Sequence, residues 1–344
     1  MEGAISVALI NSDSRPYWMD TVDLLFAPEG YDYSSRYRWK WVNEGVDPRK
    51  LKGQSVLMIF LGTSQNGEYY LPLREAIVTE VSDHGPFVVI RYRLGRFVDL
   101  TASPHEFSIR FDHQLRQMME EGKVTTGHTG HLVFRLGTID VRFSTKEVDD
   151  DHNWANIVKE VVRTKIFSES VFLRFHRLVE DESGAPLTME EGQFLLRPGR
   201  VYRMDIVQYL PTQDGSNGGI ERSRTTDLGK IEIETMEMHM DALEDELEVV
   251  GRYDDHTFFF VAKRVSEKTY SRMAVVGKGA DSFYIPSLVF QMQIAPYRLV
   301  FLGYIGFLAG LIIIGLSTII PGAEFILAAG GSVISTAGLL FLER

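Results

Sequence analysis

Two histidines and three aspartates are the residues of this chain whose spacing could bind a metal ion. His128 and His131 lie three residues apart in GHTGH, and Asp149, Asp150 and Asp151 follow one another. Zinc usually needs a third protein ligand beyond two histidines, and the glycines around this pair are typical of a turn. The aspartate run lacks the spaced oxygen ligands and the later bidentate glutamate of a calcium loop. We therefore predict no metal site and no cofactor, and interpret the aspartates as the start of a helix.

Motifs for nucleophilic catalysis and phosphate binding are absent from the sequence. The chain has no cysteine, which excludes disulfides, thiolate metal sites and cysteine nucleophiles, and favours a reducing compartment. No GxSxG elbow occurs, and GKGADS at Gly277 lacks the spaced glycine and the following Ser or Thr of a phosphate-binding loop. Paired catalytic carboxylates remain open among 47 acidic residues, because such pairing is spatial. We predict no catalytic residue, and favour a protein that is not an enzyme.

One stretch, YDYSSRYRWKW from Tyr31 to Trp41, alternates aromatic and basic residues. On a strand the two kinds would lie on opposite faces, whereas a platform for stacking nucleic-acid bases needs both on one exposed surface. We therefore interpret the aromatic face as core. A second basic row follows in VVIRYRLGRF, and two neighbouring strands would join both rows into a patch for an anionic partner. The predicted partner-binding residues are Arg36, Arg38, Lys40, Arg91, Arg93 and Arg96.

The overall charge limits what this patch can bind. The formal net charge is −11, so the chain as a whole would be repelled by a phosphate backbone. Nucleic acid or a nucleotide stays an alternative partner through a local patch, and is not the favoured one. Acidic neighbours would neutralise the basic rows if the strand order brought them close, and the sequence does not give that order.

The C-terminal part, residues 299–344, differs from the rest because it contains two apolar runs without a charged residue inside either run. About 20 apolar residues suffice for a transmembrane helix, so these runs predict a two-helix transmembrane hairpin. Arg298 and Arg344 flank the hairpin, and its short loop carries Glu324. The excess of positive charge outside the hairpin predicts an integral membrane protein whose soluble part and both termini face the cytosol.

Small residues recur at four-residue spacing in both apolar runs, and such spacing lets helix backbones approach closely. These residues would either pack the two helices of one hairpin together or join several copies, and the sequence leaves both possibilities open. The predicted helix-packing or oligomerisation residues are Gly306, Gly310, Ala328, Ser332 and Thr336.

Most segments of the first 298 residues alternate apolar and polar side chains with the period of two that is typical of strands. The predicted fold class is mainly β, with sandwich or small-barrel domains, one or two amphipathic helices and the C-terminal hairpin. The helices are expected within 103–122 and after Asp151. The predicted divisions are a β domain at 1–100, a sandwich-like domain with helical insertions at 101–210, a polar linker or loop at 211–227, a β segment at 228–298 that completes the sandwich or forms a third unit, and the hairpin at 299–344.

The absence of catalytic motifs and the apolar C-terminal part together favour a membrane-anchored, cytosol-facing binding or scaffold module. Its expected partners are the lipid bilayer and a protein, either a different one or a second copy. One alternative is a self-assembling, membrane-disrupting effector whose glycine-rich hairpins oligomerise on triggering. A second alternative is a membrane-tethered enzyme without a recognisable motif.

Overall fold

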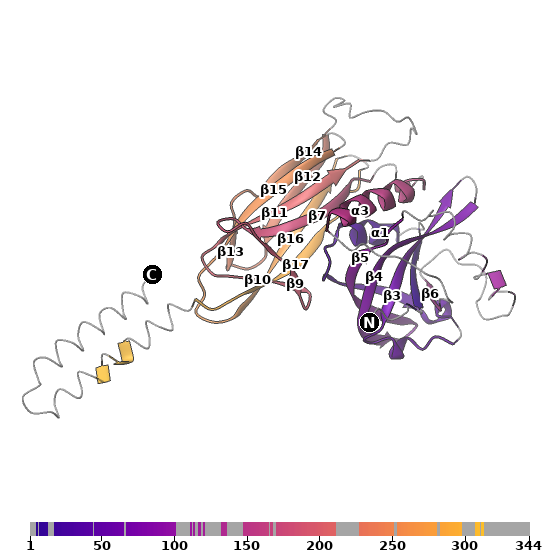
Figure 1. The fold of residues 1–344 in the computed structure, drawn as a ribbon, viewed down its shortest axis with the longest axis horizontal. Coiled ribbons are helices and arrows are strands. Elements are labelled where there is room, and N and C mark those ends of the chain that lie inside the picture. The colour runs from indigo at the N-terminus through magenta and orange to yellow at the C-terminus, as the bar shows by residue number, and fades with distance from the viewer. Residues whose placement is uncertain are drawn as a thin grey trace, which may run out of the picture.

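Among the residues that it describes, the computed structural model of the protein contains three β-sheets and two α-helices (Figure 1). The residues that the structure describes are 5, 7–12, 17–43, 45–64, 67–100, 132–135, 147–164, 166–167, 170–210, 227–250, 253–280 and 283–297, together with single positions within 111–120 and 307–312. Two of the sheets have six strands and the third has five. The predicted β-rich character is therefore present.

The first sheet has the strand order β2-β5-β4-β3-β1-β6. Its strands are β1 Val7–Ser12, β2 Asp32–Arg38, β3 Ser55–Ser64, β4 Gly67–His84, β5 Phe87–Phe97 and β6 Leu132–Arg135. β1 pairs with β3 in parallel, and the other neighbours are antiparallel. The tight turn between β4 and β5 uses Gly85 at a φ of 61°, a backbone conformation that glycine adopts without steric cost. Short 3-10 turns at Trp39–Trp41 and Pro48–Lys50 follow β2.

The other two sheets pack face to face as a sandwich, with orders β14-β12-β16-β17-β10-β9 and β13-β15-β11-β7-β8. Phe175 lies 5.6 Å from Phe194 and 5.4 Å from Phe290 between ring centroids, which joins the two inner faces. The strands are β7 Phe172–Glu180, β8 Ala185–Leu187, β9 Met189–Glu190, β10 Gln193–Leu196, β11 Val201–Tyr209, β12 Asp227–Thr235, β13 Met240–Ala242, β14 Glu246–Val250, β15 Tyr253–Ala262, β16 Thr269–Gly279 and β17 Leu288–Ile294. Strict alternation of buried and half-exposed residues along β11 leaves an outer face on its sheet.

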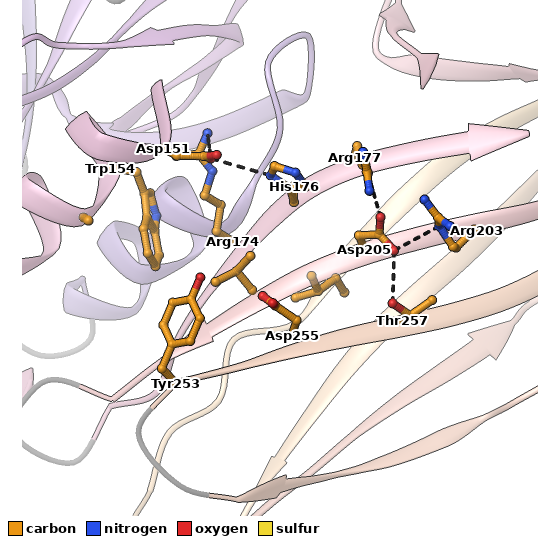
Figure 2. Close-up of a pocket in the computed structure, with 13 residues that line it drawn as sticks. Asp151, Trp154, Arg174, His176, Arg177, Arg203, Asp205, Tyr253, Asp255 and Thr257 are labelled. Carbon is orange, nitrogen blue, oxygen red and sulfur yellow. Dashed lines mark hydrogen bonds and ion pairs between the residues drawn. The ribbon is translucent and has the colours of Figure 1, made fainter. Parts of the chain in front are cut away.

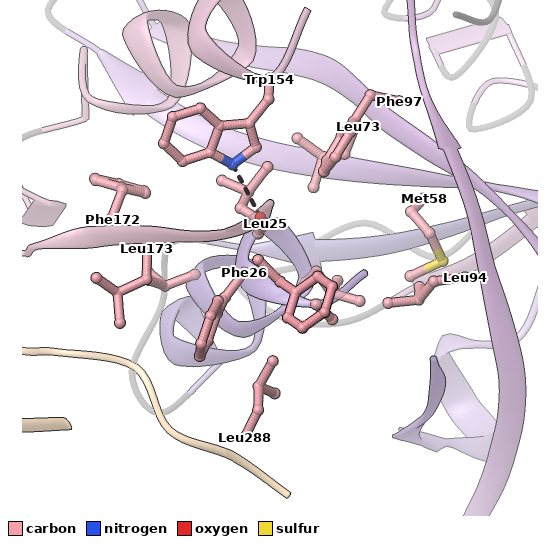
Figure 3. Close-up of a cluster of buried hydrophobic side chains, with 14 of the residues drawn as sticks. Leu25, Phe26, Met58, Leu73, Leu94, Phe97, Trp154, Phe172, Leu173 and Leu288 are labelled. Atoms are coloured by element: carbon pink, nitrogen blue, oxygen red, sulfur yellow. Dashed lines mark hydrogen bonds between the residues drawn. The ribbon is translucent and has the colours of Figure 1, made fainter. Parts of the chain in front are cut away.

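Two helices, α1 Trp18–Phe26 and α3 Glu147–Val161, lie where the first sheet meets the sandwich (Figure 1). Phe26 of α1 packs edge to face on Phe290 of β17, with ring centroids 6.4 Å apart. The indole N–H of Trp154 on α3 donates to the carbonyl of Leu25 at 2.9 Å (Figure 3). The hydrophobic core is therefore continuous across the junction.

Arg74 of β4 is the largest fully buried side chain, with 1% of its surface exposed. Its guanidinium donates to the carbonyls of Leu24 and Ala27 at the end of α1, at 2.9 and 2.7 Å, and to the carbonyl of Gly95 on β5. The same group lies over the Phe97 ring, 4.4 Å from its centroid. One side chain thus satisfies helix-terminal carbonyls that would otherwise be buried without donors.

The predicted transmembrane hairpin was wrong. Among the residues that the structure describes, no helix has both the length and the apolar character needed to cross a membrane. Within 299–344 only 307–309 and 311–312 are described, as short helical pieces, and Leu308, Leu311 and Ile312 there are exposed. The prediction failed because an uncharged apolar run is necessary for a span, but does not by itself establish a continuous helix. The membrane anchor and the integral-membrane localisation with cytosolic termini, both inferred from that run, are withdrawn with it.

The two helices expected from sequence have different outcomes. A helix is present at the aspartate run, but α3 begins at Glu147, ahead of the predicted start at Asp151, so the three aspartates lie inside the helix. Most of the helix expected within 103–122 lies outside the described residues, and the positions that are described there, 111, 113, 116, 117 and 120, are helical. The α1 helix was not predicted.

We predict that replacing Arg74 with methionine lowers the free energy of unfolding by roughly 3 to 5 kcal/mol, because buried carbonyls lose charged donors. Urea unfolding followed by circular dichroism measures this. The matched control is Arg49→Met, which removes an exposed ion pair to Asp83 and should cost about 0 to 1 kcal/mol. Equal losses in the two variants would contradict the structural role given to Arg74.

Candidate functional site

A β-bulge in β7 concentrates positive charge on one side of the sandwich. Asp205 of β11 pairs with Arg177, and the next residue, Ile206, pairs with Phe175, so His176 is an extra residue in the strand. In a regular strand, residues three apart point to opposite faces. The bulge removes this constraint: Arg174 opposes Val207 and Arg177 opposes Asp205. Because Val207 and Asp205 share the outer face of β11, both arginines lie on that face.

Residues 174–177 of β7, with neighbouring residues of β8, β9 and β10, form one wall of a cavity of about 700 Å³ between the sandwich and the first sheet, here called the junction cleft. The opposite wall comes from β4, β5 and the segment after α1. That segment approaches β9 so closely that a Cβ on Gly30, which has a φ of 84°, would lie 2.8 Å from the Cβ of Met189. The basic side chains that line the cleft are Arg93, Arg96, Arg174, His176 and Arg177.

The arginines of the junction cleft are each held by a carboxylate. Arg93 makes a bidentate contact with Asp32 at 2.9 and 3.2 Å, and Arg96 donates to Glu75 at 2.9 Å. On the sandwich side, Arg174 contacts Asp151 at 2.9 Å and Arg177 donates to Asp205 at 2.7 Å. Such ion pairs fix the guanidinium orientation, and a guanidinium has five N–H donors, more than one carboxylate can use.

A second cavity, of about 500 Å³, lies on the outer face of the same sheet and is here called the bulge pocket (Figure 2). It is lined by α3, β7, β11 and β15. Arg174, His176 and Arg177 line both cavities, so the bulge separates them. His176 Nδ1 lies 3.6 Å from Asp151, and this carboxylate raises the pKa of His176.

The predicted basic rows are neighbours, because β2 pairs with β5 and aligns Asp32 with Arg93 and Ser34 with Arg91. Acidic side chains neutralise part of the patch: Arg91 pairs with Glu80 at 2.9 Å. Of the six predicted residues, Arg93 and Arg96 line the junction cleft, and the others do not.

The rest of the predicted patch lies at the turn end of these strands. Arg36 lies over Phe87, 4.6 Å from the ring centroid, and Arg38 lies 5.3 Å from the ring of Trp41. Lys40 is in the 3-10 turn that follows β2 and is exposed. Within the described residues, the guanidinium groups of Arg36 and Arg38 contact aromatic rings and form no ion pair with a carboxylate.

The predicted packing residues of the apolar C-terminal part, Gly306, Gly310, Ala328, Ser332 and Thr336, lie outside the described residues, as do His128 and His131. Within the part of the chain that the structure describes, no group of three or more acidic or histidine side chains is arranged to hold a metal ion.

A pair of half-buried carboxyls, Asp20 and Asp23, lies one turn apart on α1. Tyr33 donates to Asp20 and Tyr284 donates to Asp23, each at 3.2 Å. Burial raises the pKa of Asp20 to about 6. Burial, reinforced by the Asp20 charge, raises the pKa of Asp23 to about 7. Such values suit proton transfer, but neither residue lines the two cavities, so we assign the pair no catalytic role.

Sequence reasoning missed the sandwich side of the site. The segment FLRFHRLVE contains Arg174, His176 and Arg177. Strict alternation would place Arg174 and His176 on one face of the strand, and Arg177 on the other. The paired cations in RFHR were the available signal, but the bulge that aligns them depends on pairing with β11.

Comparisons with known proteins give no family for this chain. No family model and no curated protein matches it. A GH5 xyloglucanase of Bacteroides ovatus, solved with a XXXG heptasaccharide, shares 14% identity over 30% of this chain and 17% of its own, with a TM-score of 0.18. The VesB protease of Vibrio cholerae shares 8% identity over 78% of this chain and 96% of its own, with a TM-score of 0.19. At these scores neither likeness bears on fold or function.

We predict that Asp23→Asn stabilises the protein relative to wild type increasingly as the pH rises. A carboxyl whose pKa is raised on folding contributes stability that is complete below its ordinary pKa of 3.8 and is lost as the pH passes its folded value, here about 7. Asparagine removes that loss. Urea unfolding at several values between about pH 5 and about pH 8 measures the difference. The control is Asp181→Asn, at an exposed carboxyl, and a pH-independent effect of Asp23→Asn would contradict the assignment.

Proposed function

We propose that this protein is a β-rich binding module, and that the junction cleft receives an anionic group of its ligand. The observation that carries the proposal is the composition of the cleft. Four arginines and His176 line it against two acidic side chains, Glu29 and Glu75. Each of these arginines is paired with a carboxylate, and three of the partners, Asp32, Asp151 and Asp205, do not line the cleft, so its wall presents more basic than acidic side chains within a chain of net charge −11.

The arrangement of the arginines supports binding of a defined anion rather than loose attraction. Arg93 and Arg96 have about a third of their side-chain surface exposed, so they are partly desolvated as well as held by carboxylates. A charge in such a setting is screened less by salt than one on an open surface. A phosphate or carboxylate group entering the cleft would accept hydrogen bonds from donors whose orientation is already fixed.

The size and lining of the cleft favour a small ligand or a short segment of a partner. A volume of about 700 Å³ lies within the range of roughly 300 to 1,000 Å³ that is typical of small-molecule sites. Ile77, Leu187, Met189 and Phe194 add apolar surface to the same cavity, which would contact the uncharged part of a ligand.

Isothermal titration calorimetry with pyrophosphate and with citrate tests the proposal and separates phosphate from carboxylate recognition. We expect saturable binding of at least one probe, and we expect Arg96→Gln to weaken it by about tenfold or more, as for the loss of a charge-assisted hydrogen bond. Arg93→Gln should act in the same direction.

The control for these variants is Arg91→Gln, which removes a charge from the same strand outside the cleft. Its affinity should match that of wild type. Failure of both anions to bind would overturn the proposal. An equal loss of affinity in Arg91→Gln would also overturn it, because it would show a general effect of charge.

A further inference from the structure

The bulge pocket has a basic end centred on Asp205 of β11 (Figure 2). This carboxylate accepts hydrogen bonds from Arg177 at 2.7 Å and from Thr257 at 3.1 Å, and lies 3.3 Å from Nε of Arg203. Two guanidinium groups therefore share one carboxylate. Within the described residues, only Nε of Arg177 is engaged, so its terminal N–H groups remain for a ligand. A ligand carboxylate at this end would complete the neutralisation.

The other end of the bulge pocket is acidic. Asp255 of β15 is exposed and, within the described residues, forms no ion pair. Tyr253 lies two residues before it on the same side of the strand and is 62% exposed. Partial burial and then the charges of Asp255 and Asp151 raise the pKa of Tyr253, and all three residues line the pocket. Arg174 balances Asp151 at 2.9 Å, so Asp255 keeps an unbalanced charge.

Strand register gives the separation of the two ends. β11 and β15 pair so that Asp205 opposes Thr257, whereas Asp255 opposes Val207. The ends are thus two residues apart along the sheet, or roughly 7 Å at the rise of an antiparallel strand. Trp154, Ala155 and Val207 provide apolar surface between and beside them.

We infer that the bulge pocket binds a zwitterion of the size of an α-amino acid or a dipeptide. Its ammonium group contacts Asp255, and the Tyr253 hydroxyl lies beside it. Its carboxylate accepts hydrogen bonds from Arg177 and Arg203, and its side chain lies on the apolar wall near Trp154. The pocket volume of about 500 Å³ accommodates a molecule of this size.

This site is separate from that of the proposed function. Arg203 and Asp255 line the bulge pocket but not the junction cleft, whereas Arg93 and Arg96 line the cleft but not the pocket. Variants at these positions therefore report on one cavity each.

The test begins with a thermal-shift screen of the proteinogenic L-amino acids and of diglycine against the full chain. The strongest binder is then titrated calorimetrically beside its N-acetyl and C-amide derivatives. We expect each derivative to bind about tenfold or more weakly than its parent, because each has lost one charge-assisted contact. Asp255→Asn should abolish the preference for the free amine over the N-acetyl form. Arg203→Gln should abolish the preference for the free carboxylate over the amide.

Asp254→Asn is the matched control, because Asp254 precedes Asp255 on β15 and accepts a hydrogen bond from its backbone N–H. It should leave both preferences intact. The inference is overturned if no amino acid or dipeptide binds, or if both derivatives bind as tightly as the parent. It is also overturned if Arg96→Gln weakens amino-acid binding as much as Asp255→Asn does, because the ligand would then lie in the junction cleft. None of these results depends on whether pyrophosphate or citrate binds.

Discussion

The arrangement of the two parts of this protein depends on the buried guanidinium of Arg74. It holds the carbonyl end of α1 against β4 and β5, and α1 in turn packs Phe26 onto β17 of the sandwich. A buried charge is costly unless its hydrogen bonds are satisfied, so the side chain confines the helix end to positions where its carbonyls reach these donors. The segment that follows α1 lines the junction cleft, and its position is therefore set by the same interaction.

The second feature on which the structure depends is the β-bulge at His176 in β7. A regular β7 would point Arg174 and Arg177 to opposite sides of the sheet, and one of them would enter the apolar core between Phe175 and Leu178. The extra residue His176 avoids that cost and places both arginines outside. The sandwich thus keeps a dry interior while presenting a cationic strip on its surface, at the point where the first sheet faces it.

Local pattern in the sequence determines part of this structure. Alternation predicted β2 and β5, and their pairing joins the two basic rows as suggested. It could not show that Glu80, Asp32 and Glu75 would meet those arginines, because such contacts follow from strand register. The α1 helix was missed although Trp18, Val22 and Leu25 have helical spacing, and the membrane hairpin was wrong because hydropathy alone does not establish a long helix. The bulge at His176 arises from pairing between distant strands, which no local pattern encodes.

Arg177 belongs to the walls of both cavities and is tied to Asp205. An anion in the junction cleft that draws this guanidinium towards itself would weaken its hold on Asp205, and would alter the affinity of the bulge pocket. Thermodynamic linkage requires the reverse effect to have the same size. If both cavities bind the ligands proposed for them, this single shared side chain would provide heterotropic coupling without any movement of one sheet against another.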